Sequence, residues 1–145
     1  MSKKLRLSSF VSKVSYGGIT LTSFEIRSLP IKDLFCPCDT VPGYSAQISK
    51  SIKKNGLYNP IIVVRVPTED YLAHCKENNF RTSNIPDRPA LNVVWGGNNR
   101  VEAAKNLGFD AIDCVMMPTF ELAMKVQSIH RKNYPRENEA LAQKS

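Results

Sequence analysis

The sequence has no long hydrophobic run. No stretch of about 18 apolar residues occurs, so neither a membrane-spanning helix nor a membrane partner is expected. The basic residues near the N-terminus, Lys3, Lys4 and Arg6, are not followed by the apolar segment of a secretory signal peptide. We therefore predict a cytoplasmic protein.

Cysteine pairs at metal-site spacing are lacking as well. Cys36 and Cys38 form a C-x-C pair, but no second pair follows at the spacing of a zinc finger. Cys75, beside His74, lies in a different segment whose pattern predicts a helix. These features predict no metal site. With Cys114 also unpaired by pattern, they favour reduced thiols over a disulfide framework.

Length and charge limit the kind of protein. A chain of 145 residues with 42% hydrophobic residues predicts one compact domain with a short appendage, and it contains no internal repeat. The 20 Lys and Arg residues against 13 Asp and Glu give a net charge of +7, which favours phosphate-bearing partners such as nucleotides or nucleic acid. The basic residues are spread along the chain, so a solvated basic surface is as good an interpretation as a DNA-binding face.

The first third of the chain predicts a hairpin, a strand and a helix. A Gly-Gly dipeptide at 17–18 separates two alternating segments, which indicates a β-hairpin or two short strands. Alternation over residues 24–27 fits a half-buried strand, and residues 35–44 are predicted as a loop. Ser45 is predicted to cap a helix that ends before Gly56.

The remainder alternates between strands and helices. Residues 61–66 form a continuous β-branched run, which suits a strand covered on both faces. This alternation predicts an α/β fold of the α+β type, with a small, partly parallel mixed sheet. Further strands are predicted over residues 91–95 and 111–116, and helices over residues 67–78, 99–107 and 118–131.

The most informative segment is residues 93–104 (VVWGGNNRVEAA), a buried strand followed by a glycine turn and a helix start. A helix start exposes unpaired N–H groups and a partial positive charge, so it receives anions, phosphate above all. Gly96 and Gly97 let the backbone come close to such a ligand. Arg100 opposes the helix dipole by roughly 0.3–1 kcal/mol, a cost that a bound phosphate or a nearby carboxylate removes. The segment therefore predicts an anion site, in particular a nucleotide site.

The polar residues of this turn have structural interpretations too. Asn98 or Asn99 is typical of an N-cap, and both are also candidates for contact with phosphate. Asn99 and Glu102 have the spacing of a capping box, which favours a structural role for Glu102. Arg100 is the main candidate for a phosphate contact, with an internal ion pair as the alternative. Catalytic residues stay unknown, and Glu102 and His130 are the candidates for acid–base chemistry.

Three segments, in this order, resemble boxes of ParB-like N-terminal domains. Residues 51–63 (SIKKNGLYNPIIV) resemble the box that opens these domains. Residues 97–108 (GNNRVEAAKNLG) resemble the GERRxRAA box, and residues 126–131 (VQSIHR), with 135–140 (PRENEA) after them, resemble the ENIQR box. The resemblance extends over roughly residues 24–140. It implies the fold of the ParB/sulfiredoxin superfamily, in a stand-alone and divergent form, and binding of CTP or ATP beside the glycine–arginine turn.

The same resemblance implies further site residues. Arg131 is expected to reach the nucleotide pocket from the last helix, and Pro60 to shape its rim. Gln127 and Ser128 stand where the family has the Glu and Asn that help to hold Mg²⁺. Because Gln is a poor ligand for a hard cation, a Mg²⁺ cofactor is not favoured. Asn98 stands where sulfiredoxins carry a nucleophilic cysteine, and an amide cannot attack as a thiolate does, so sulfinic-acid reduction is not expected.

Three functions stay open. The first is a stand-alone ParB-like module that binds a nucleotide and acts on or with nucleic acid, DNA included. The second is a small NTPase, kinase or nuclease of the same fold. The third is an accessory binding or structural protein, for example of a phage or mobile element, that has kept the fold without activity. Residues 1–22 are expected to form an extension that adds strands or a protein-partner surface. Residues 23–145 are expected to form the ParB/sulfiredoxin-like domain, which is too short for a full partition protein.

Overall fold

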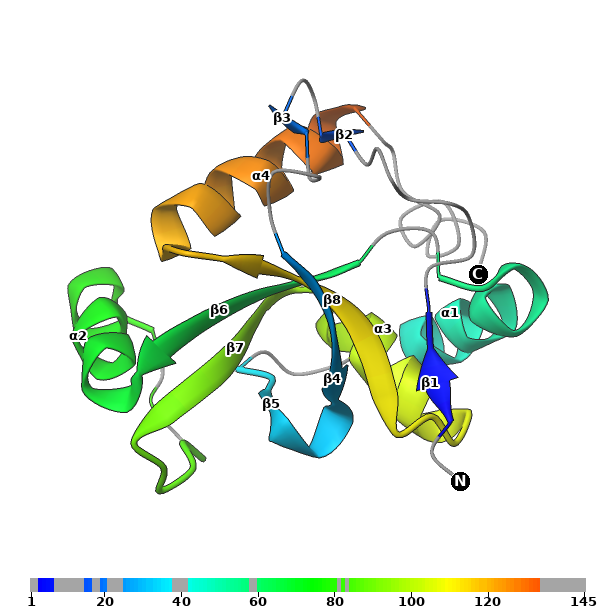
Figure 1. Ribbon diagram of the computed structural model, residues 1–145, viewed down its shortest axis with the longest axis horizontal. Coiled ribbons are helices and arrows are strands. Elements are labelled where there is room, and N and C mark those ends of the chain that lie inside the picture. Colours follow the sequence, from blue (N-terminus) through cyan, green and yellow to red (C-terminus); the bar gives the residue numbers. More distant parts are fainter. Residues whose placement is uncertain are drawn as a thin grey trace.

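The protein is described from a computed structural model, and Figure 1 shows the arrangement of its elements. Expectations for residues 7–14 and 134–145 lie outside the part of the chain that the structure describes. The described residues are 3–6, 15–16, 19–20, 25–37, 42–57, 60–80, 82 and 84–133.

A mixed six-stranded sheet forms the centre of the molecule. Its strands are β1 (Lys4–Leu5), β4 (Ile26–Pro30), β5 (Leu34–Phe35), β6 (Ile61–Pro67), β7 (Ala90–Gly96) and β8 (Ala111–Met117). The strand order is β1-β8-β6-β7-β5, with β4 also paired to β8. Three pairs are parallel, β1 with β8, β5 with β7 and β6 with β8, whereas β6 with β7 and β4 with β8 are antiparallel. The predicted α/β class with a mixed, partly parallel sheet is therefore confirmed.

Strand β8 organises the sheet because three strands pair with it. β4 pairs with residues 111–115, β1 with residues 111–112 and β6 with residues 114–117. A strand has two hydrogen-bonding edges. β4 therefore occupies one edge of β8, and β1 and β6 follow each other along the other edge. The N-terminal residues 4 and 5 are in this way part of the central sheet.

Helices cover both faces of the sheet (Figure 1). One core cluster contains residues of α1 (Pro42–Asn55) and α3 (Asn98–Asn106), which pack against each other. The second contains residues of α2 (Thr68–Asn78) and α4 (Phe120–Asn133). Strand β6 supplies both clusters in alternation, Ile61 and Val63 to the first, and Ile62 and Val64 to the second. This confirms the prediction of a strand buried on both faces. A 3₁₀ turn, η2 (Ile31–Asp33), joins β4 to β5.

Two local predictions need correction. Residues 35–44 are not simply a loop, because Phe35 belongs to β5 and α1 already begins at Pro42. Ser45 is therefore inside α1 and does not cap it. The physical reason is tertiary, since Ser45 is only 2% exposed and its hydroxyl donates a hydrogen bond to Asn99 of α3, whereas a capping serine would accept one from an N–H group of its own helix start.

Other local predictions are confirmed. β2 (Ser15–Tyr16) and β3 (Ile19–Thr20) pair antiparallel, as the hairpin prediction requires. Gly56 and Gly108, which follow α1 and α3, have positive φ values of 78° and 82°. Helices commonly end with a glycine in this conformation.

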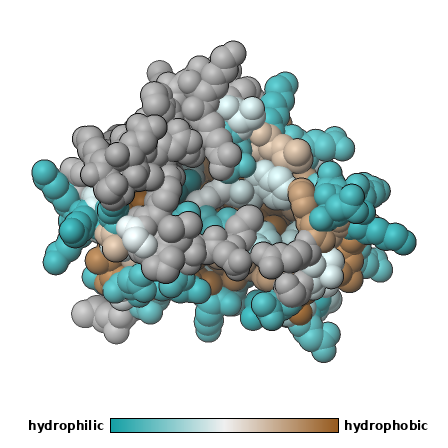
Figure 2. Space-filling model, turned by 180° about the vertical axis from the view of Figure 1, so that it is seen from behind, coloured by the Kyte–Doolittle hydropathy of each residue, from teal (hydrophilic) through white to brown (hydrophobic). Residues whose placement is uncertain are grey.

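The described helices include none that is long and apolar enough to cross a membrane. Seen from behind, the described surface is largely hydrophilic, and hydrophobic residues show between hydrophilic ones toward the side where α2 lies (Figure 2). Two large apolar residues of this region are exposed, Leu72 on α2 and Phe80 just after it.

Candidate functional site

The predicted glycine turn joins the end of β7 to the start of α3. β7 ends at Gly96, and Gly97 is the N-cap of α3 with φ 118° and ψ 24°. The prediction that Asn98 or Asn99 is the N-cap is wrong. Gly97 has a positive φ, a backbone conformation that residues with side chains disfavour, and the helix begins at the next residue. Asn98 and Asn99 therefore both belong to the first turn of α3. Without an asparagine cap, the predicted capping box between Asn99 and Glu102 is not formed.

Both glycines lie against neighbouring side chains. A Cβ on Gly97 would stand 2.6 Å from Cδ1 of Ile61 and 3.1 Å from Nη2 of Arg100. A Cβ on Gly96 would stand 3.1 Å from Nε2 of Gln127. Because Gly96 and Gly97 have no side chains, the Gln127 amide and the Arg100 guanidinium can lie directly against the backbone of the turn.

The two asparagine side chains of the turn have different surroundings. Oδ1 of Asn99 accepts a hydrogen bond of 3.1 Å from the hydroxyl of Ser45, which ties α3 to α1. Oδ1 of Asn98 is buried and has no hydrogen-bond partner among the described residues. An unpaired buried acceptor costs about 1–3 kcal/mol. The structure therefore contains an acceptor at the helix start that a ligand with a donor group would satisfy.

Arg100 is half-buried, and its charge acts on Cys114 of β8. Burial raises the pKa of the Cys114 thiol to about 12 from its ordinary value of 9.0, and the Asp113 carboxylate adds to this rise. The positive charge of Arg100 lowers the pKa of this thiol and so opposes part of the shift. The Cys114 thiol also donates to the Ile112 carbonyl at 3.3 Å. It is therefore a neutral, buried group and not a nucleophile.

Helix α4 supplies the remaining predicted residues. Gln127 is half-buried beside Gly96, whereas Ser128 is exposed. The backbone at positions 130 and 131 belongs to α4, but the side chains of His130 and Arg131 lie outside what the structure describes. Pro60 is buried next to Ile61, the residue whose side chain reaches Gly97.

The structure therefore brings together most of the predicted site. Gly96, Gly97, Asn98, Asn99 and Arg100 form one turn, and Pro60 adjoins it through the next residue of β6. Glu102 is half-buried on α3, and its side chain makes no hydrogen bond or ion pair with any described residue.

Sequence reasoning assigned no site role to Ser45 or Gln127, which contact this turn. Ser45 looked like a helix cap because a serine precedes the apolar residues of α1. Gln127 could have been found, because the motif resemblance places it where the family has a residue that helps to hold Mg²⁺.

Metal-ligating side chains do not gather among the described residues. No group of three or more His, Cys, Asp and Glu side chains there is placed to hold a metal ion. Of the described cysteines, Cys36 is half-buried and Cys75 and Cys114 are buried, and none of these three forms a disulfide bond.

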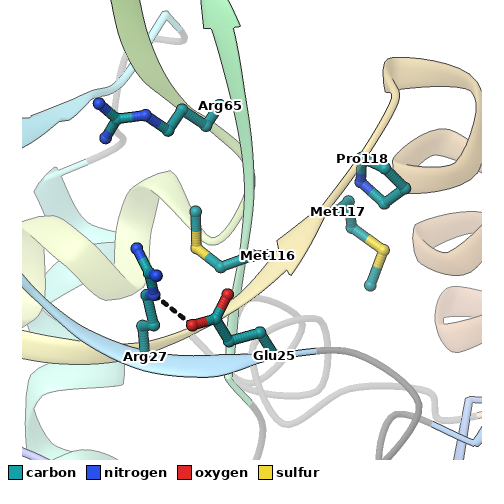
Figure 3. A pocket seen from close by; sticks show the side chains of 6 residues that line it. All are labelled: Glu25, Arg27, Arg65, Met116, Met117 and Pro118. Carbon is teal, nitrogen blue, oxygen red and sulfur yellow. Dashed lines mark hydrogen bonds and ion pairs between the residues drawn. The ribbon is translucent and has the colours of Figure 1, made fainter.

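A separate pocket of about 390 Å³ lies near the end of β8 (Figure 3). It is lined by Glu25, Arg27, Arg65, Met116, Met117 and Pro118. None of the predicted site residues is among them.

Comparison with known proteins found similarity in structure only. No protein-family model and no curated protein matches the chain. Sulfiredoxin from Arabidopsis thaliana is 19% identical with a TM-score of 0.44, and the match covers 70% of this chain and 93% of that one. The C-terminally truncated chromosome-partitioning protein ParB from Caulobacter crescentus, complexed with CTP-γ-S, is 22% identical with a TM-score of 0.49. That match covers 83% of this chain and 61% of the ParB chain. Both likenesses concern the fold alone.

Proposed function

We propose that this protein is a nucleotide-binding module whose ligand phosphate binds at the turn of Gly96, Gly97 and Arg100. The main support is the acceptor Oδ1 of Asn98, which is buried in the first turn of α3 without a hydrogen-bond partner among the described residues, two positions before Arg100. The N-terminus of a helix of nine residues provides N–H groups and a partial positive charge for the phosphate.

A nucleotide fits this combination better than a simple anion. Arg100 and the helix start supply donors and positive charge, which match phosphate oxygens. Asn98 instead offers an acceptor, and a fully ionised phosphate has no donor to give it. A ribose hydroxyl or a base amino group has one. A ligand that carries both a phosphate and such a donor satisfies both halves of the turn.

Helix α4 is proposed to complete the site. Position 131 follows Gln127 by four residues, so both positions lie on the same face of α4. Since Gln127 contacts Gly96, this face is directed toward the turn, and Arg131 is proposed as a second phosphate contact. Pro60 is proposed to hold Ile61 in place against Gly97.

The cofactor is proposed to be a nucleoside triphosphate without a tightly held metal. The sequence resemblance indicates CTP or ATP. Neither Gln127 nor Ser128 is an anionic ligand for Mg²⁺, and Ser128 is exposed. We also propose that the module works with nucleic acid, since the net charge of +7 favours such a partner.

Isothermal titration calorimetry tests this proposal. CTP, ATP, GTP and ADP are titrated with and without Mg²⁺ into the parent protein and into the Arg100→Ala and Asn98→Ala variants. Saturable binding of at least one nucleotide is expected, abolished by Arg100→Ala and weakened about tenfold by Asn98→Ala, the effect of losing one hydrogen bond.

Arg88→Ala is the matched control because Arg88 is an exposed arginine of the loop before β7. This variant should bind like the parent. If no nucleotide binds, or if Arg100→Ala binds as well as Arg88→Ala, the turn is structural and the proposal fails.

A further inference from the structure

The pocket near the end of β8 contains two arginines from different strands. Arg27 is on β4 and Arg65 is on β6, and the two strands lie on opposite edges of β8. Figure 3 shows both side chains on the same side of Met116, with Met117 and Pro118 across the pocket. We call the pocket and its six lining residues the arginine groove.

Strand register places the arginine groove on the same sheet face as the predicted site. Arg27 pairs with Cys114 in the β4–β8 ladder, and Ile61 pairs with Cys114 in the β6–β8 ladder. Ile61 in turn contacts Gly97. Because alternate residues share a face, Arg27 lies on the face of Leu29, which packs with the cluster that also contains Ile61. Arg27 and the turn thus lie at the two ends of one cross-strand row.

Arg65 lies farther along the same face. It follows Ile61 by four residues on β6, which is roughly 13 Å along the strand. Arg27, Arg65 and the turn therefore lie on one face of the sheet, and the distance from the turn to Arg65 is longer than a single phosphate group. A ligand that carries several phosphates in a row matches this spacing.

Charge in the arginine groove is only partly balanced. Nε of Arg27 and Oε1 of Glu25 form an ion pair of 2.5 Å. Nη1 of Arg65 donates a hydrogen bond of 3.4 Å to the side-chain oxygen Oδ1 of Asn92, and no described carboxylate lies within 4.0 Å of Arg65. Met117 is buried and Met116 is half-buried. An acidic peptide would thus find no fully exposed methionine to anchor an apolar side chain, whereas a phosphate would find a guanidinium whose charge no described carboxylate balances.

We propose that the arginine groove binds the sugar–phosphate backbone of a single-stranded nucleic acid. A volume of about 390 Å³ accommodates a group of the size of one nucleotide, and a flexible single strand can place one nucleotide there. Arg27 and Arg65 contact phosphates and read no sequence. This deepens the proposed function by giving the module a macromolecular partner, and it can be tested separately because its residues are not those of the turn.

Fluorescence anisotropy with a labelled oligothymidylate tests the groove. Arg65→Gln and Arg27→Gln should each weaken binding about tenfold at low salt, the effect of one charge-assisted hydrogen bond. Each should also reduce the slope of log affinity against log salt by about 0.7. Glu25→Gln should strengthen binding, because it removes the anion that competes for Arg27. A variant that only disturbed the fold would not bind more tightly.

Lys76→Gln is the matched control, because Lys76 is an exposed cation of α2 and lies outside the groove. All four variants change exposed side chains, so their thermal unfolding should match the parent. The proposal is overturned if both arginine variants bind like Lys76→Gln with unchanged salt slopes. Tighter binding of a glutamate-rich peptide than of the oligonucleotide also overturns it.

The two proposals fail in distinguishable ways. Oligonucleotide binding that depends on Arg27 and Arg65, without any nucleotide binding that depends on Arg100, supports the groove and contradicts the proposed function. Nucleotide binding that depends on Arg100, with oligonucleotide binding insensitive to both groove arginines, supports the proposed function and overturns the groove.

Discussion

The guanidinium of Arg100 lies against Gly97, with Nη2 3.1 Å from the position that a Cβ on Gly97 would take. An arginine in the first turn of a helix opposes the helix dipole. Its contact with the glycine places that charge beside the N–H groups of the helix start instead of in solvent. A cationic group and the start of a helix thus lie close to the same glycine, which supports the proposed phosphate site.

Substitution of Gly97 should destabilise the fold. Gly97→Ala puts a Cβ 2.6 Å from Ile61 in a backbone conformation with φ 118°, so a loss of about 2–4 kcal/mol in the free energy of unfolding is expected. Gly108→Ala is the control, because Gly108 also has a positive φ but has no atom within 4 Å of its Cβ position. It should lose only about 1–2 kcal/mol. Urea unfolding measures both losses. Equal losses would show that the Ile61 side chain moves away from the new Cβ without lowering the free energy of unfolding.

The hydrogen bond between Ser45 and Asn99 should stabilise the contact of α1 with α3. Ser45→Ala is expected to lower the free energy of unfolding by about 1–2 kcal/mol, since it leaves the Asn99 oxygen without this donor. A double-mutant cycle with Asn99→Ala measures the coupling, which should be about 1 kcal/mol. A coupling near zero would mean that the two side chains stabilise the protein independently.

Stability should fall at high pH because of Cys114. The pKa of this thiol is about 12 in the folded protein and near 9 when unfolded, so the folded state keeps a proton that the unfolded state loses. Its contribution is complete below about pH 9. It then decreases by up to about 1.4 kcal/mol per pH unit until about pH 12.

Cys114→Ala is the comparison for this pH dependence. Lysines and tyrosines that titrate in the same range affect both proteins and cancel in the difference. The variant should be less stable than the parent at pH 8, and the gap should narrow between pH 9 and 11. A gap that stays constant would contradict the assignment.

The environment of His74 predicts that an apolar ring can replace the imidazole without loss of stability. Its ring stacks on Phe120 with centroids 4.2 Å apart and meets Trp95 edge-on at 5.7 Å. Nε2 is buried without a hydrogen-bond partner among the described residues. His74→Phe should therefore match or exceed the parent in stability, whereas His74→Ala should lose about 2–4 kcal/mol through the cavity it leaves. If His74→Phe is as unstable as His74→Ala, the imidazole nitrogen has an essential partner.

Features that depend on local periodicity or on glycine were predictable from the sequence. The β-branched run of β6 showed its burial on both faces, and Gly56 and Gly108 marked helix ends because few other residues take a positive φ there. Gly97 also signalled a turn, but its role as the cap was missed. Asparagine is a common cap, and only the backbone geometry shows that the helix begins earlier.

Features that depend on register were not predictable. Arg27, Arg65 and Met116 are far apart in the sequence, and they meet because β4 and β6 pair with opposite edges of β8. No local pattern encodes that choice of partners. Ser45 illustrates the same limit. A serine before an apolar segment predicts a helix cap, but the sequence does not show whether its hydroxyl bonds to its own helix or, as here, to Asn99 of a neighbouring helix.

The location of nucleotide binding tests the central claim most directly. Amide proton–nitrogen spectra of the parent protein are recorded during titration with CTP and with ATP. Our account predicts saturable shifts of the Gly97, Asn98 and Arg100 amide signals with at least one of them, and the loss of these shifts in Arg100→Ala. Unchanged signals for these residues at saturating nucleotide, or saturable shifts confined to other parts of the fold, would contradict it.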